Sequence, residues 1–233
     1  MPAAKPATAV ALDASLTVAN ADERSWVSRG AHKLIGALDA FGVTVQGRRC
    51  LDAGASTGGF TEVLLDRDAR EVVAADVGYG QLAWPLRSDP RVRVMERTNV
   101  RELTADAIGG PVDLVVADLS FISLATVLPA LVSCASADAD IVPMVKPQFE
   151  VGKSRVGPGG VVSDPVLRAD SVLGVAHRAA ELGWHTADVT ASPLPGPSGN
   201  VEYFLRLRAS TDRPLVGDAL ADAVARAVAK GPQ

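Results

Sequence analysis

The stretch that decides the fold reads Leu51-Asp52-Ala53-Gly54-Ala55-Ser56-Thr57-Gly58-Gly59-Phe60. The apolar run that begins at Cys50 predicts a short buried strand ending at Ala53, and the glycine-rich residues 54–59 predict a tight turn. A helix is expected to begin at Phe60, and its free N–H groups would face an anion held by the turn. A strand, a glycine turn and a helix in this order are typical of ligand-binding α/β proteins.

Further strands and helices are predicted on both sides of this turn. Short apolar runs predict strands over residues 50–53, 71–77, 92–96, 112–117 and 140–145. Helical spacing, with Gly42 as a stop signal, predicts helices over residues 28–41, 60–65, 124–134, 165–182 and 214–230. Two late strands, over 186–190 and 201–208, are expected to form an antiparallel hairpin at one edge. The alternation predicts a doubly wound α/β fold, in which helices cover both faces of a mostly parallel seven-stranded sheet.

Composition limits the classes of protein to which the chain can belong. Its 233 residues are 48% hydrophobic and 21% charged, which supplies a sizeable core. The formal net charge of −4 argues against tight nonspecific binding of nucleic acid by this chain alone, although a local basic patch would suffice for a specific contact. Cys50 and Cys134 stand in apolar segments without a Cys/His cluster, which predicts reduced core thiols and no metal site. Without a signal peptide or a membrane-spanning apolar run, the chain is expected in the cytoplasm.

The glycine pattern also bears on the ligand. Its spacing is G-x-x-x-G-G, so the G-x-G-x-x-G fingerprint of nicotinamide enzymes is not met. Asp52 before the first glycine is typical of methyltransferases, where it accepts from the ammonium group of S-adenosylmethionine, and Asp76 could accept from the two ribose hydroxyls of an adenosine. The alternative is a glycine-rich loop without a cofactor. The residues predicted to bind S-adenosylmethionine are Asp52, Gly54, Ser56, Thr57, Gly58, Gly59, Phe60, Asp76 and Asp118.

Charged residues near the ends of other elements are the candidates for catalysis. A doubly wound sheet places its ligands outside the carboxyl ends of its strands. Asp118 and Lys146 end two neighbouring strands there, and as a pair they would satisfy each other. Glu202 in the last strand and Lys33 in the first helix could reach the same crevice. The alternatives are a purely structural Lys146–Asp118 ion pair, a solvated Lys33 and a Glu202 on an exposed strand face.

Five motifs occur in order between about Arg24 and the C-terminus. They read Ser28-Arg29-Gly30-Ala31-His32-Lys33-Leu34, Gly54-Ala55-Ser56-Thr57-Gly58-Gly59-Phe60, Asp118-Leu119-Ser120-Phe121-Ile122-Ser123, Lys146-Pro147-Gln148-Phe149-Glu150 and Ser198-Gly199-Asn200-Val201-Glu202. Together they resemble the TlyA (haemolysin A) family of ribosomal RNA 2′-O-methyltransferases, and the mycobacterial members of that family in particular.

The resemblance implies an activity and a site. The family shares a Lys-Asp-Lys-Glu tetrad with the wider FtsJ-like methyltransferases, and its members here would be Lys33, Asp118, Lys146 and Glu202. S-adenosylmethionine is the implied cofactor. The implied substrates are cytidine riboses in the small- and large-subunit ribosomal RNA of ribosomal subunits, and their methylation is linked to capreomycin and viomycin susceptibility. The resemblance implies neither binding to a membrane nor a metal ion.

The resemblance also implies a domain organisation. Residues 1–23 are rich in Ala, Thr and Pro and are expected to form a flexible arm or the remnant of a linker. Residues 24–27 resemble the family's interdomain linker motif, and residues 28–233 the FtsJ-like methyltransferase domain. Family members carry an S4-like RNA-binding domain before that linker, and none is recognisable here. The alternative function is therefore a cofactor-binding domain that is inactive on RNA without its S4-like domain.

The expected mechanism is an in-line displacement of the cofactor's methyl group by a ribose 2′-oxygen. Lys146 is the first choice for activating the hydroxyl, either as an ammonium that favours the developing alkoxide or as a neutral amine that takes the proton. Asp118 would orient Lys146, while Lys33 and Glu202 would position the ribose.

Residues around this site are candidates for contacts with RNA. Phe121 or Phe149 could stack on the target base, with core packing as the alternative. Polar and basic residues near the mouth could contact the RNA, with a solvated surface as the alternative; they are Arg29, His32, Lys153, Arg155 and Ser198. A membrane-lytic protein, suggested by the older family name, is not supported because no long apolar or cationic amphipathic segment is present.

Overall fold

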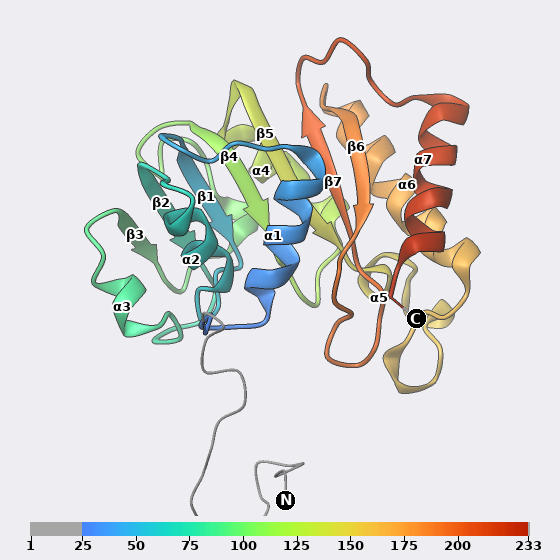
Figure 1. Ribbon diagram of the computed structural model, residues 1–233, viewed down its shortest axis with the longest axis horizontal. Coiled ribbons are helices and arrows are strands. Elements are labelled where there is room, and N and C mark those ends of the chain that lie inside the picture. Colours follow the sequence, from blue (N-terminus) through green and yellow to red (C-terminus); the bar gives the residue numbers. More distant parts are fainter. Residues whose placement is uncertain (1–24, 233) are drawn as a thin grey trace, which may run out of the picture.

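A seven-stranded sheet runs through residues 25–232, the part of the chain that the computed structural model describes (Figure 1). The strands are β1 (Arg49–Ala53), β2 (Glu71–Ala75), β3 (Val92–Met95), β4 (Val112–Ala117), β5 (Ala135–Val145), β6 (His185–Ala191) and β7 (Tyr203–Arg208). The predicted arm over 1–23 and Arg24 of the linker motif lie outside the described residues.

The strand order β3-β2-β1-β4-β5-β7-β6 places β1 at the point where the winding of the chain reverses. Strands β1 to β5 pair in parallel, whereas β7 is antiparallel to both β5 and β6. The predicted doubly wound fold and its antiparallel edge hairpin are therefore confirmed. Because ligands of such sheets bind at the reversal point, the crevice at the carboxyl ends of β1 and β4 is the expected site.

Helices cover both faces of the sheet (Figure 1). The sheet therefore separates the hydrophobic core into two clusters, one on each face. On one face α1 and α2 pack against the sheet, and on the other face lie α4, α6 and α7. Successive residues of a strand contribute to opposite clusters, as Cys50 and Leu51 do in β1, because strand side chains alternate. The helices are α1 (Gly30–Phe41), α2 (Gly59–Asp66), α3 (Trp84–Arg87), α4 (Leu124–Cys134), α5 (Pro147–Glu150), α6 (Pro165–Glu181) and α7 (Gly217–Lys230), with 3-10 turns η1 (Val100–Glu102), η2 (Lys153–Arg155) and η3 (Pro158–Gly160).

Local sequence signals explain where several helices begin and end. Gly42 has a φ of +60° and ends α1 in the left-handed conformation, as the stop signal predicted. At the start of α6 the Asp164 side chain accepts from Val166 N–H, and Pro165 occupies the first turn. In α7 the predicted apolar stripe is confirmed, since Leu220 and Val224 are buried. Among the described residues no helix has the length and apolar character needed to cross a membrane.

Some element boundaries differ from the predictions. β5 begins at Ala135, directly after α4, and not at residue 140. Its first four residues alternate Ala with polar residues and lie partly or fully exposed, so they form no apolar run that predicts a strand. β7 begins at Tyr203, so Glu202 immediately precedes the strand. The short helices α3 and α5 were not predicted, since four residues carry no readable helical period. Both cysteines are buried and free, as predicted.

Candidate active site

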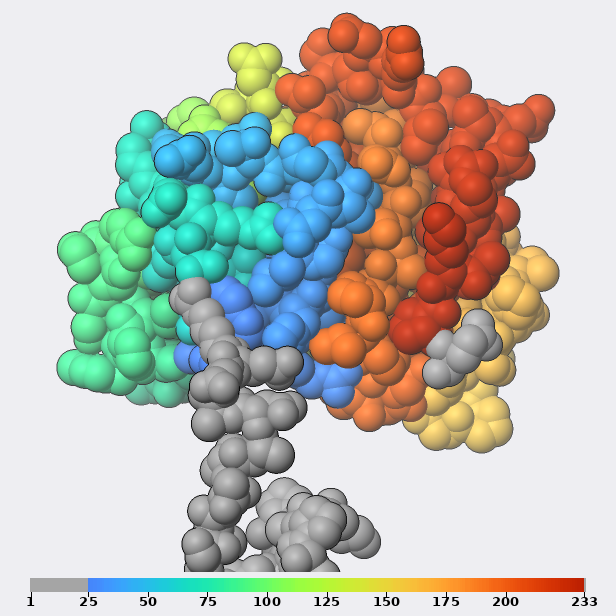
Figure 2. Space-filling model, in the orientation of Figure 1, coloured from blue at the N-terminus to red at the C-terminus, as the bar shows by residue number. Residues whose placement is uncertain are grey.

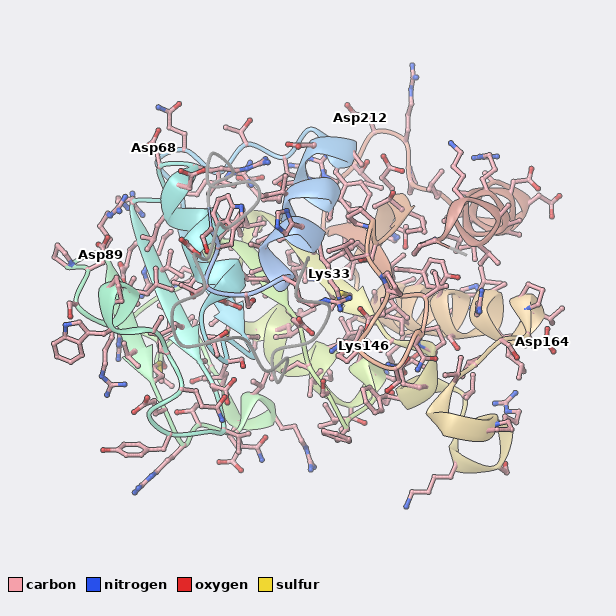
Figure 3. All side chains as sticks on the ribbon, turned by 60° about the horizontal axis from the view of Figure 1, so that its bottom comes forward. Lys33, Asp68, Asp89, Lys146, Asp164 and Asp212 are labelled. Atoms are coloured by element: carbon pink, nitrogen blue, oxygen red, sulfur yellow. The ribbon has the colours of Figure 1, made fainter. Side chains whose placement is uncertain are left out.

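Two lysine–carboxylate pairs lie at the carboxyl ends of the central strands. Lys146 follows β5 and Asp118 follows the neighbouring strand β4, and Lys146 Nζ is 2.6 Å from Asp118 Oδ1. Lys33 lies in the first turn of α1, and its Nζ is 2.5 Å from Oε2 of Glu202. Figure 3 shows the labelled Lys33 and Lys146 close together in the middle of the molecule. The structure therefore brings together the four residues predicted to act in catalysis.

The Lys33–Glu202 pair is almost completely enclosed. The exposed fractions of the two side chains are 6% and 2%. A solvated Lys33 and a Glu202 on an exposed strand face, the two alternatives considered from sequence, are therefore wrong. Gly196 packs directly against the carboxylate, because a Cβ at that position would lie 2.8 Å from Glu202 Oε1. Two buried charges of this kind are tolerated because each compensates the other.

The Lys146–Asp118 pair is more open. The exposed fractions of its side chains are 10% and 28%. Lys146 Nζ also donates to Ser120 Oγ at 3.0 Å. The loop that carries Asp118 and Ser120 is tied to the segment after Lys146, because the Glu150 carboxylate accepts from Ser123 Oγ at 2.6 Å and from the backbone N–H of Leu124 at 2.8 Å. Burial raises the pKa of Glu150.

A cavity of about 280 Å³ joins the two pairs. A loop after β6 closes one side of it, since the Arg29 guanidinium donates to the carbonyl of Pro195. Figure 2 shows the start of α1, in blue, against this orange segment. The cavity is lined by ten predicted site residues, Arg29, Lys33, Gly54, Ser56, Thr57, Gly59, Phe60, Asp118, Lys146 and Glu202. It is also lined by Ser28, Gly30, Ala55, Ser120 and Pro197, to which no role was assigned from sequence.

A second cavity, of about 530 Å³, continues along the ends of the strands toward Asp76. It shares four lining residues with the first cavity: Gly54, Ser56, Asp118 and Ser120. Asp76 and Phe121 also line it, as do residues that sequence reasoning missed, namely Val77, Gln81, Thr98, Asn99, Val100, Leu119, Ile122 and Val127. Most of the missed residues lie shortly after the ends of β2, β3 and β4, and that position is the signal that could have found them.

The glycine turn lies between the two cavities. Gly54 has a φ of +89°, and a Cβ there would lie 2.4 Å from the carbonyl oxygen of Asp118, so a larger residue would have to displace the next strand end. Asp76 braces the turn, because its carboxylate accepts from the N–H groups of Ser56 at 2.8 Å and Gly78 at 2.7 Å. Each carboxylate oxygen keeps a second lone pair with which it can accept from a ligand.

Asp52 lies beneath the turn and lines neither of these cavities. It is fully buried, and its Oδ2 accepts from Thr61 Oγ1 at 2.7 Å. Its Oδ1 is buried without a hydrogen-bond partner among the described residues. Burial raises the pKa of Asp52 to about 7, while the hydrogen bond from Thr61 opposes the shift. An unpaired buried carboxylate oxygen next to a glycine turn fits a ligand that carries an ammonium group.

Two aromatic residues predicted to contact the target base lie at the outer rim. Phe121 is 91% exposed, so core packing is wrong for this residue. Its φ of +64° is rare for a bulky side chain, and such conformations cluster at active sites and ligand-binding segments. The ring packs against Phe149, with the centroids 5.3 Å apart and the planes tilted by 52°. The pair therefore presents an aromatic surface beside the larger cavity.

The remaining predicted site residues lie outside both cavities. Gly58 has a φ of +103° and caps the start of α2. The exposed polar residues of this group are His32, Lys153, Arg155 and Ser198. Within residues 25–232, no cluster of three or more His, Cys, Asp or Glu side chains could hold a metal ion.

Comparison with known proteins gives a consistent result. Residues 26–209 match the FtsJ-like methyltransferase family. The whole chain is 75% identical to the 16S/23S rRNA (cytidine-2′-O)-methyltransferase TlyA of Mycobacterium tuberculosis and covers 87% of that protein. It is 36% identical to the 23S rRNA (cytidine-2′-O)-methyltransferase TlyA of Campylobacter jejuni, over 77% of this chain and 69% of that protein. A solved structure from Streptococcus thermophilus, named as a hemolysin, is 38% identical with a TM-score of 0.81, over 88% of this chain and 75% of that one.

Proposed function

The chain belongs to the FtsJ-like methyltransferase family, and we propose that it transfers the methyl group of S-adenosylmethionine to the 2′-hydroxyl of cytidine in ribosomal RNA. The Mycobacterium tuberculosis relative is named for action on 16S and 23S rRNA, and it is 75% identical over the whole chain. We propose the same two RNA molecules, within ribosomal subunits, as the substrates. The observation that carries the proposal is the Lys146–Asp118 pair on the wall of a cavity that adjoins the glycine turn.

The proposed cofactor site follows the larger cavity. When bound, S-adenosylmethionine supplies a methyl group on a positively charged sulfur, so the methyl group is already activated. Asp76 is proposed to accept from the two hydroxyls of the cofactor's adenosine ribose through the free lone pairs of its carboxylate. Gly54 lines both cavities at the turn, where the cofactor's amino-acid end is proposed to lie, and the unpaired oxygen of Asp52 beneath the turn is proposed to attract its ammonium group.

The proposed role of Lys146 is to activate the ribose hydroxyl. A 2′-hydroxyl is a weak nucleophile until its proton is removed or its developing negative charge is stabilised. As an ammonium, Lys146 donates to the oxygen and stabilises that charge while the hydroxyl proton passes to solvent; as a neutral amine, it accepts the proton itself. In both cases Asp118 holds Nζ in place, 2.6 Å from its own carboxylate. Holding the reacting groups in position accounts for much of the rate.

The Lys33–Glu202 pair is proposed to position the ribose. Both residues line the same cavity as Lys146, but their charges are already compensated by a 2.5 Å contact. A rigid, enclosed pair of this kind supplies fixed dipoles and excludes water from one wall of the cavity. The ring of Phe121, which is exposed, is proposed to stack on a target base that has left its helix. The surface residues proposed to contact the RNA are Arg29, His32, Lys153, Arg155 and Ser198.

The proposal is tested with Lys146→Ala on purified ribosomal subunits that lack the modification, using S-adenosylmethionine with a labelled methyl group. We expect the rate of transfer to fall by roughly 10³-fold, because the variant lacks the amino group in either of its proposed roles, as an ammonium donor or as a neutral proton acceptor. The affinity for the cofactor should change little. Lys230→Ala, at the end of α7, is the matched control. Mapping the label on the RNA checks the nucleotide, and normal transfer by the Lys146 variant would contradict the proposal.

A further inference from the structure

Ser120 lies where the two cavities meet. It lines both of them, together with Gly54, Ser56 and Asp118. Its Oγ accepts from Lys146 Nζ at 3.0 Å. The residue stands two positions after Asp118, and in an extended segment side chains two positions apart point to the same side. Asp118 and Ser120 can therefore hold one amino group between them.

The two contacts, with Asp118 and with Ser120, together affect the orientation of the Lys146 amino group. Lys146 Nζ has three hydrogen-bonding positions, which are N–H bonds in the ammonium and two N–H bonds and a lone pair in the neutral amine. They are arranged tetrahedrally at the end of a flexible four-carbon side chain. Contact with Asp118 alone leaves the group free to rotate about that contact. The ion pair with Asp118 at 2.6 Å and the hydrogen bond to Ser120 at 3.0 Å together limit the directions that remain for the rest of the amino group. Within residues 25–232 Nζ has these two partners, and Lys146 lines the smaller cavity, so the third direction is available to a ligand.

We propose that Ser120 is a positioning residue for methyl transfer, which fixes the rotation of the Lys146 amino group so that its third direction meets the ribose 2′-oxygen. The inference rests on the proposed function of Lys146. It holds for both protonation states of that residue, because an ammonium presents its third N–H there and a neutral amine presents its lone pair. Ser120 acts through Lys146, without a proton transfer of its own.

Other contacts support the shape of the loop, so removing the hydroxyl should not disturb it. Ser123 and Leu124 are held by Glu150, and Phe121 packs against Phe149. Ser120 itself is exposed to the cavity, and its Oγ contacts Lys146. Ser120→Ala therefore isolates one hydrogen bond, and Ser120→Thr keeps a hydroxyl at the same place.

The first measurement is the single-turnover rate of methyl transfer to ribosomal subunits at saturating S-adenosylmethionine. We expect Ser120→Ala to lower this rate by roughly tenfold to a hundredfold, since a misdirected catalytic group is less effective even when it is present. KM for the subunits and Kd for the cofactor should stay within about twofold, and Ser120→Thr should recover most of the rate. Ser88→Ala, at an exposed serine after α3, is the control.

The second measurement follows the reactivity of Lys146 in the protein without RNA. Trace acetic anhydride labels amines only in their neutral form, and Lys230 serves as the internal reference. Because the Lys146 amine loses a hydrogen-bond partner, Ser120→Ala should raise the labelling rate of Lys146 relative to Lys230 at a fixed pH, and Ser120→Thr should not. An unchanged labelling profile would overturn the proposal, as would an alanine variant that transfers methyl groups at the wild-type rate, or a threonine variant as slow as the alanine variant. An inactive wild-type protein would instead overturn the function proposed above, and the role of Ser120 with it.

Discussion

The two ends of the sheet both hold charged residues, but their hydrogen-bonding states differ. At the amino end of the parallel strands the fully buried Asp140 accepts from Arg48 at 2.7 Å and from Arg206 at 2.8 Å. At the carboxyl end Lys146 has two partners and a third direction that remains available at a cavity wall. An ion cluster whose carboxylate is held on both oxygens contributes to stability, whereas one with an open hydrogen-bonding position can act on a ligand.

The largest effect is expected for Asp140→Asn, which tests whether the cluster at the amino end of the strands serves stability and not activity. The variant leaves at least two arginines without their counter-charge, and we expect the free energy of unfolding to fall by about 3 kcal/mol. The rate of methyl transfer per folded molecule should be unchanged, because the cluster lies at the opposite end of the strands. Urea denaturation and a transfer assay measure the two quantities. The control is Asp39→Asn, whose exposed pair with Arg67 should contribute about 0–1 kcal/mol. Equal stability of the two variants would contradict the contrast.

Glu202→Gln sharpens the comparison, because Glu202 lies at the carboxyl end but is as enclosed as Asp140. The amide keeps the shape but leaves the Lys33 charge uncompensated, so we expect a loss of about 2 kcal/mol in stability. We also expect a roughly tenfold slower transfer, since the ribose is held less rigidly. Combining it with Lys33→Met should restore part of the stability but not the activity. Recovery of activity in the double variant would mean that this pair has only a structural role.

The smallest expected effect concerns Asp52, which is buried with one oxygen unpaired. Burial raises the pKa of Asp52 to about 7, so in the folded protein the carboxyl is protonated below that pH and ionised above it. An ionised carboxylate attracts the ammonium group of S-adenosylmethionine, and affinity should therefore rise roughly tenfold between pH 5.5 and 7.5. Calorimetric titration at several pH values measures this. Asp52→Asn should show weaker binding without the pH dependence, and a pH-independent wild type would exclude the role.

Much of the fold could be predicted because its signals are local. The apolar runs before Gly54 and Asp118 identify buried strands, and the glycine pattern identifies the turn between β1 and α2. The start of β5 was missed because its first four residues alternate Ala with polar residues and form no apolar run; the pairing of Ala135 with Val112 of β4 holds them in the sheet. The short helix α5 was missed because its four residues form part of a loop that is shaped by contacts from elsewhere, such as that of Glu150 with Ser123.

The residues of the candidate site also include some that local signals predicted and others that they did not. Asp118 and Lys146 were predictable as neighbours because each follows a strand, and the carboxyl ends of adjacent parallel strands lie together. Ser120 was overlooked, although its position two residues after Asp118 was the available signal. Phe121 could not be assigned from sequence, because an apolar residue after a strand fits a core as well as a surface.

The sequence by itself determined which chemical groups stand at the ends of which elements, because glycine turns, apolar periodicity and strand endings are properties of neighbouring residues. Only the tertiary structure decided how those groups combine. Lys33 and Glu202 are 169 positions apart, and they meet because α1 packs across the sheet beside the loop that follows β6. The same packing separates an enclosed pair from an open one, since burial depends on contacts between distant segments and not on the residues next to each lysine.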